Sequence, residues 1–171
     1  MGLLDDARRN AEAEHRARTE AIDEESNRLQ EFCREFLAAV TQEKIPPRQL
    51  LETVGHAKEG LLRTKSWETL EPVGQGWLVE IHRYEDSSFG FAKVVTTDGR
   101  ALSSTYLKEF AAQPKGSPHR AALHALDGRP GAGDPLVGRW DALQPHNLKY
   151  LVRACGDYLA AAAENRPIKL W

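Results

Sequence analysis

Glu80, His82 and Tyr84 stand at alternate positions of one segment and are the residues best spaced for chemistry. In an extended strand, alternate side chains share one face and lie about 6.5 to 7 Å apart. A carboxylate, an imidazole and a phenol at that spacing could exchange protons with a bound substrate, as in a small hydrolase or nuclease. Lys93 or Arg100 on a neighbouring strand could stabilise developing negative charge. Any half-buried antiparallel strand has a polar face of this composition, so the pattern favours an ordinary polar face and keeps catalysis as the alternative.

The remaining histidines and glycines do not predict a metal or cofactor site. On a helix, His124 and Asp127 would share a face, but His119 would point about 140° away from His124, and no third ligand converges on them. The glycine-rich run 128–134 resembles a phosphate-binding loop only in composition, because it lacks the preceding strand and the Gly-Lys-Ser or Gly-Lys-Thr ending. We therefore expect no cofactor and no metal ion.

Length and composition fit one ordinary domain of 171 residues, with 41% hydrophobic residues, 28% charged residues and a net charge of -2. Cys33 and Cys155 fall within apolar helical patterns, so we expect both to be buried. Because a signal peptide and an apolar run of about 20 residues are both missing, the expected location is cytoplasmic, with no membrane contact. From Gly99 onward the chain has ten basic and six acidic residues, and this basic excess keeps nucleic acid as an alternative partner.

One long helix is expected over residues 5–44, where helix-forming residues run without proline or glycine until Pro46 and Pro47. Its second half carries a wide apolar stripe with the spacing of a helix packed on a core. The stripe consists of Leu29, Phe32, Cys33, Phe36, Leu37 and Val40. We expect this half to be docked on a single α+β domain that spans residues 29–171.

The first half of this helix, residues 1–28, has few apolar side chains and cannot bury much surface against its own chain. His15, Arg18 and Glu25 occupy the positions that would continue the apolar stripe. Acidic residues outnumber basic ones by 11 to 7 over residues 1–44, which leaves a charge of +2 on the rest of the chain. The half is either a solvated helix held by intrahelical ion pairs, a disordered tail, or a projecting acidic arm for docking or oligomerisation.

The docking arm is the interpretation we favour, and it predicts a non-enzymatic protein that binds a partner protein or assembles with itself. Apolar residues at both ends of the chain would contribute to that contact. The residues predicted to bind are Leu3, Leu4, Ala11, Arg18, Ile22 and Trp171.

The middle of the chain predicts a four-stranded antiparallel meander, because β-branched and aromatic runs alternate with short turns such as Asp98-Gly99. The four strands are expected at 66–73, 77–84, 89–96 and 100–107. Simple alternation places Trp77, Val79 and Ile81 on the core face and Leu78, Glu80, His82 and Tyr84 on the other face.

Helices from both ends of the chain are expected to cover one face of this meander, which gives an α+β fold. A short helix is predicted from Pro47 to about Glu59, packed antiparallel to the first helix. Proline caps predict a helix near 117–126 and another that begins at Pro135. A final amphipathic helix is predicted from Pro145 to about residue 164.

Overall fold

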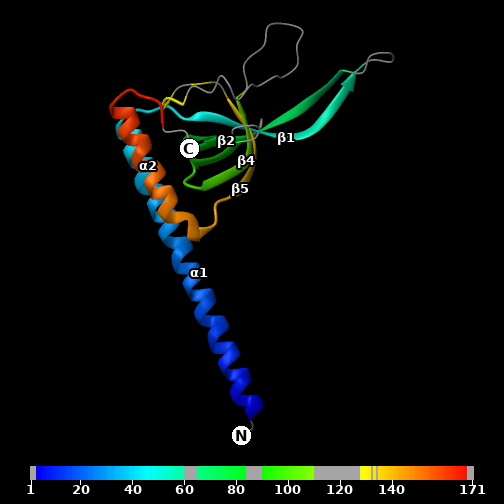
Figure 1. The fold of residues 1–171 in the computed structure, drawn as a ribbon, viewed down its shortest axis with the longest axis vertical. Coiled ribbons are helices and arrows are strands. Elements are labelled where there is room, and N and C mark those ends of the chain that lie inside the picture. The colour runs from blue at the N-terminus through cyan, green and yellow to red at the C-terminus, as the bar shows by residue number, and fades with distance from the viewer. Residues whose placement is uncertain are drawn as a thin grey trace.

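The computed structural model describes residues 3–59, 65–83, 90–109, 128–131, 133 and 135–168. Its elements are α1 (Leu3–Gln42), β1 (Arg48–Glu59), β2 (Lys65–Arg83), β3 (Gly90–Thr96), β4 (Ala101–Glu109), β5 (Leu136–Ala142), the 3-10 turn η2 (Pro145–Asn147) and α2 (Leu148–Ala163). The fold is α+β, as predicted, with a long N-terminal helix, antiparallel strands and a C-terminal helix (Figure 1). Within the described part of the chain, no helix is long and apolar enough to cross a membrane.

The strands β1 to β5 form a closed barrel, so the described sheet has five strands where the sequence predicted four. Sequential neighbours pair antiparallel, and β1 pairs with β5 in parallel, with Leu50 opposite Leu136. This follows from the odd strand number, because strands that alternate in direction bring the first and the fifth together pointing the same way. Leu50 and Leu136 are both fully buried at this seam.

Two segments predicted as short helices are strands of this barrel. The prediction for residues 47–59 was wrong because the segment pairs along most of its length with β2 and also with β5. The prediction of a helix beginning at Pro135 was also wrong, because residues 136–142 pair with both β4 and β1. Closing the barrel pairs the backbone N–H and C=O groups of both segments with residues far away in the chain. This pairing overrides weak local helix signals. The predicted helix near 117–126 lies outside the described residues.

The predicted strands 66–73 and 77–84 are one long strand, β2, whose pairing with β1 shifts register between Pro72 and Gly74. The outer part of β2 pairs only with β1, and residues 76–83 pair with β3. As a result, the outer half of the β1–β2 hairpin reaches away from the barrel as a two-stranded ribbon (Figure 1). Gly76 is needed where the two halves meet, since a Cβ there would lie 2.6 Å from the Val95 carbonyl oxygen.

The C-terminal half of α1 and α2 lie side by side and pack on the barrel, running in the same direction (Figure 1). The Phe36 ring joins the layers, because it meets the Trp77 ring edge-on at 6.2 Å and the Tyr158 ring at 5.9 Å. Cys33 and Cys155 are buried between the layers, as predicted. The final helix also begins where the sequence predicted, since η2 starts at Pro145 and is followed directly by α2 at Leu148.

Candidate functional site

A β-bulge in β2 decides which side chains share a face. Leu78 pairs with Val94 and Glu80 pairs with Lys93, so Val79 is an extra residue on β2. Paired residues lie on the same face of a sheet, and neighbours along β3 lie on opposite faces. Leu78 and Glu80 therefore point to opposite faces, which corrects the simple alternation predicted from sequence.

On the face that α2 covers, β2 and β3 place a compact charged cluster. The Lys93 ammonium donates to Glu80 Oε2, and His82 Nε2 lies 2.5 Å from Glu80 Oε1. Glu80 is only 9% exposed and Lys93 only 5% exposed, so this is not the solvent-facing polar strand that its composition suggests. The Lys93 ammonium also lies over the rings of Phe91 and Tyr150, at 5.5 and 5.4 Å from their centroids. Such contacts compensate the desolvation of a buried charge.

The cluster opens into a cavity of about 320 Å³ between the two strands and α2. The strands contribute the cluster itself, and α2 contributes Tyr150, Arg153, Ala154 and Asp157. Arg153 and Ala154 follow Tyr150 by three and four residues, and Asp157 follows them by four and three, so the four residues form one face of the helix above the sheet. The cavity is therefore a concave space over Glu80 and His82, two of the three catalytic candidates.

Glu80 fixes the proton position on the His82 ring. An ionised carboxylate has no proton to donate and can only accept hydrogen bonds. His82 Nε2 must then donate, which leaves Nδ1 of the neutral ring as a hydrogen-bond acceptor. The His82 side chain is 38% exposed, so this imidazole is partly open to solvent while the carboxylate behind it is buried.

The other residues considered for this chemistry do not join the cluster. Tyr84 lies outside the described residues, as do His119, His124 and Asp127. Arg100 pairs instead with Asp98 at 2.8 Å on the β3–β4 turn. The Thr96 hydroxyl and then the Arg100 guanidinium lower the pKa of the Asp98 carboxyl. Across the described residues, no group of three or more His, Cys, Asp or Glu could hold a metal ion.

Sequence reasoning missed the roof of the cavity. Arg153 and Asp157 were predicted only to lie off the apolar stripe of the final helix, and Tyr150 was not singled out. Their 3- and 4-residue spacing marks one helix face, but nothing in the sequence says that this face lies above Glu80 and His82.

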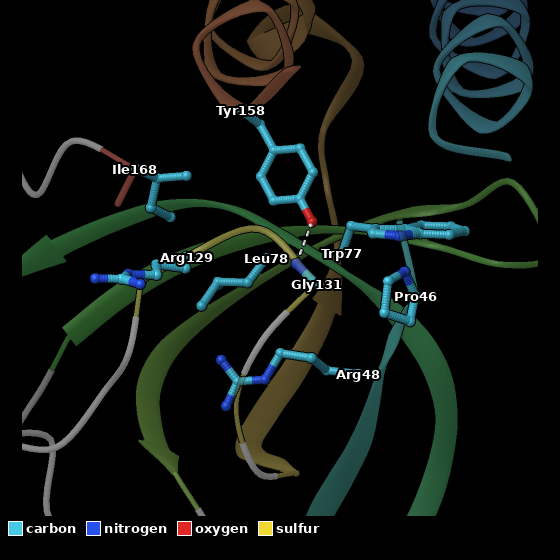
Figure 2. Close-up of a pocket in the computed structure, with 9 residues that line it drawn as sticks. Pro46, Arg48, Trp77, Leu78, Arg129, Gly131, Tyr158 and Ile168 are labelled. Atoms are coloured by element: carbon cyan, nitrogen blue, oxygen red, sulfur yellow. Dashed lines mark hydrogen bonds between the residues drawn. The ribbon is translucent and has the colours of Figure 1, made fainter. Parts of the chain in front are cut away.

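A second cavity, beside Tyr158, lies between packed elements and has no room for a ligand. Its volume is about 10 Å³, on the scale of a single water molecule. Figure 2 shows the Tyr158 hydroxyl pointing from α2 to the Gly131 amide, which donates to it at 3.2 Å. Trp77 lies beside Pro46, and its indole donates to the Ile45 carbonyl at 2.9 Å. These contacts tie α2, the 128–131 loop and the end of α1 to the barrel.

The first half of α1 has a different character, because every side chain from Ala7 to Glu25 is exposed. Ala11 and Arg18 are among them, and Ile22 is 50% exposed, which makes it one of the few large apolar residues on the described surface. Trp171 lies outside the described residues, as do the side chains of Leu3 and Leu4. Figure 1 shows this half of the helix leading away from the barrel.

Comparison with known protein families, curated proteins and solved structures finds no match to this chain.

Proposed function

We propose that the protein is an assembly module that pairs with a second copy of itself through the N-terminal half of α1. The observation that carries this proposal is the unbroken exposure from Ala7 to Glu25 on a helix whose other half is docked. A helix within a protein gains most of its stability from tertiary packing, and a helix without such packing is only marginally stable. At 1.5 Å per residue, residues 3–28 extend about 39 Å, long enough for a two-helix contact.

One face of the arm continues the docked stripe. Counting back from Leu29 in steps of 4 and 3 gives Glu25, Ile22, Arg18, His15, Ala11 and Arg8. Two-helix coiled coils use this spacing to keep one seam against the partner. The seam here is mostly polar, so its charges decide which partner and which direction it accepts.

The seam is self-complementary only in the antiparallel direction. With the two helices centred between His15 and Arg18, Arg8 of each copy faces Glu25 of the other, and Ala11 faces Ile22. A parallel pair in register would instead place Arg8, Arg18 and Glu25 against their own copies. Like charges at facing positions are destabilising, so the antiparallel arrangement is favoured.

The flanking positions support the same register. In the antiparallel pair, Glu12 faces Thr19 and Glu14 faces Ala21, so no flanking position brings like charges together. The pair would bury Ile22 of each copy, which is half exposed in the single chain. With so few apolar contacts the association is expected to be weak and sensitive to salt.

Charge reversal along the seam tests the pairing. Arg8→Glu or Glu25→Arg alone places like charges together at both ends of the dimer and should raise the dissociation constant roughly tenfold. The double variant Arg8→Glu with Glu25→Arg restores opposite charges and should return the constant to near the wild-type value. Sedimentation equilibrium over a concentration series measures all three.

Two outward-facing positions serve as matched controls. Arg16→Glu and Glu20→Arg change the charge by the same amounts, but both residues lie away from the seam and should leave association unchanged. Wild-type protein that stays monomeric up to millimolar concentration would refute the proposal. Dimers that both single variants weaken but the double variant does not restore would refute the antiparallel register.

A nucleic-acid partner stays a weaker alternative. The arm, residues 1–28, carries more acidic than basic residues, and phosphate backbones repel such a surface. Basic residues after Gly99 that the structure describes, such as Arg139 and Lys149, lie on different elements.

A further inference from the structure

The cavity under α2 holds the parts of a general-base site, separate from the arm. A buried carboxylate, Glu80, accepts hydrogen bonds on both oxygens, from Lys93 on one and His82 on the other. This arrangement holds the imidazole by its Nε2 and leaves Nδ1 available as a base. A carboxylate that orients a histidine in this way is the supporting half of many hydrolytic sites, where it acts by fixing the tautomer and ring position.

The fold supports this arrangement at some cost. Burying a charged pair such as Glu80 and Lys93 generally stabilises a protein less than apolar packing of equal volume. The bulge at Val79 turns Glu80 from the face of Leu78 to the face of Lys93, and bulges are common next to active sites for this reason. The position of the cluster, beneath a cavity and not within the packed core, is what points to a ligand.

The cavity indicates a small, uncharged substrate. Its volume of about 320 Å³ lies at the lower end of small-molecule sites. The charged groups that line it balance, because Glu80 and Asp157 offset Lys93 and Arg153. A balanced site has no net field to gather a polyanion such as a nucleic acid. Tyr150 adds an aromatic surface at the cavity, since its side chain is about half exposed there.

We infer that this cavity is a hydrolytic site for a small uncharged ester, with His82 as the general base. His82 Nδ1 takes a proton from a water molecule as the water oxygen bonds to the ester carbonyl carbon. The tetrahedral adduct then collapses, the carbon–oxygen bond to the alcohol breaks, and the imidazolium returns the proton to the leaving oxygen. One ester and one water give one acid and one alcohol, and His82 ends as it began. Glu80 and Lys93 are positioning residues, since neither touches the reacting atoms.

Steady-state hydrolysis of p-nitrophenyl acetate by the full-length protein tests the inference. His82→Gln keeps an N–H donor for Glu80 but has no basic nitrogen, so it should fold normally and lose about 100-fold in kcat. His146→Ala removes an exposed imidazole on η2 and controls for unspecific catalysis by surface histidines, so it should keep the wild-type rate. Absence of saturable turnover by the wild-type protein, or equal rates for His82→Gln and wild type, would overturn the inference.

Kinetics and NMR of a Glu80 variant test whether Glu80 positions His82. Glu80→Gln keeps an acceptor oxygen but not the charge, so kcat should fall with KM unchanged, and ¹⁵N NMR should show His82 as a mixture of ring tautomers. If the lone Lys93 charge unfolds that variant, Glu80→Gln combined with Lys93→Met removes both charges at similar volume and takes its place. Unchanged kcat and a single Nε2–H tautomer in the folded variant would show that Glu80 does not position the base.

Discussion

At the scale of single residues, the two cysteines show how burial controls chemistry. Cys33 on α1 and Cys155 on α2 are both buried free thiols. Burial raises the pKa of the Cys33 thiol to about 11. Burial first, and then the neighbouring Cys33, raise the pKa of the Cys155 thiol well above its ordinary value. Because the thiolate is the reactive form, these cysteines serve as small core residues and not as nucleophiles.

We therefore expect both thiols to be inert in the folded protein. At pH 8, Ellman's reagent should label neither cysteine in native buffer and both at once in guanidinium chloride. Since the folded pKa values are raised, the native state holds more protons than the unfolded state between about pH 9 and 11, and stability should fall as the pH rises through that window. The double variant Cys33→Ala with Cys155→Ala should lack this part of the alkaline slope. Fast labelling of the native protein would contradict the buried position.

Two glycines give a matched pair of substitutions. A Cβ at Gly138 would lie 2.8 Å from the Trp140 ring and 2.9 Å from Ser104 Oγ, whereas a Cβ at Gly156 would meet nothing within 4 Å. Gly138→Ala should cost about 1–3 kcal/mol through overpacking. Gly156→Ala, within α2, should instead stabilise the protein by up to about 1 kcal/mol through helix propensity. Urea unfolding of both variants measures the difference, and equal effects would mean that β5 is less tightly packed than described.

At the scale of elements, α1 is one helix with two roles. Its C-terminal half is anchored by Leu29, Cys33, Phe36 and Val40, each at most 8% exposed. In its N-terminal half, the described side chains from Ala7 to Glu25 are all exposed and contribute nothing to this core. The helix ends where Lys44 takes a left-handed backbone conformation, with φ of 54°, and Ile45 donates back to the Val40 carbonyl at 2.9 Å.

Replacing one large side chain by alanine in each half of α1 should therefore change the unfolding free energy by different amounts. Phe36→Ala removes a ring packed between Trp77 and Tyr158 and should cost about 3–5 kcal/mol in unfolding free energy. Ile22→Ala should change the stability of the dilute protein by less than about 0.5 kcal/mol, because its side chain is half exposed. Chemical denaturation at low micromolar concentration separates these effects from association. A large loss from Ile22→Ala there would show that the arm packs on its own chain.

At the scale of the whole molecule, the barrel depends on a short parallel seam. β1 and β5 pair only through residues 50–52 and 136–138. The Trp140 indole adds a hydrogen bond to the Leu51 carbonyl at 2.9 Å and so ties β5 to β1 a second time. The seam brings together segments that lie far apart in the chain, so it is the place where the barrel would open first.

Removing one indole donor at each of two places tests this view. Trp140→Phe should cost about 1–2 kcal/mol and speed amide hydrogen exchange selectively in residues 50–52 and 136–138. Trp77→Phe removes the donor to the Ile45 carbonyl and should loosen the joint between α1 and the barrel without affecting the seam. Amide exchange that rises equally throughout the barrel in both variants would mean that the pairing of β1 with β5 does not open separately from the rest of the barrel.

The sequence by itself determined the elements whose signals are local. Helix periodicity located α1 and α2 because a helix closes its hydrogen bonds within four residues. The Asp98-Gly99 turn located the β3–β4 hairpin, and Gly99 does have the positive φ, 81°, that the turn requires. Glu80, His82 and Lys93 were also identified as the residues whose chemistry could be combined.

Only the tertiary structure decided what depends on distant partners. The apolar spacing of Leu50, Leu51 and Val54 suits a helix turn as well as a strand, and barrel closure with β2 and β5 selects the strand. The extra residue Val79 turns Glu80 toward Lys93, and α2 then covers both and leaves a cavity. A strand satisfies its backbone only through other segments, so neither β1, β5 nor the shape of the polar site is encoded within a short stretch of residues.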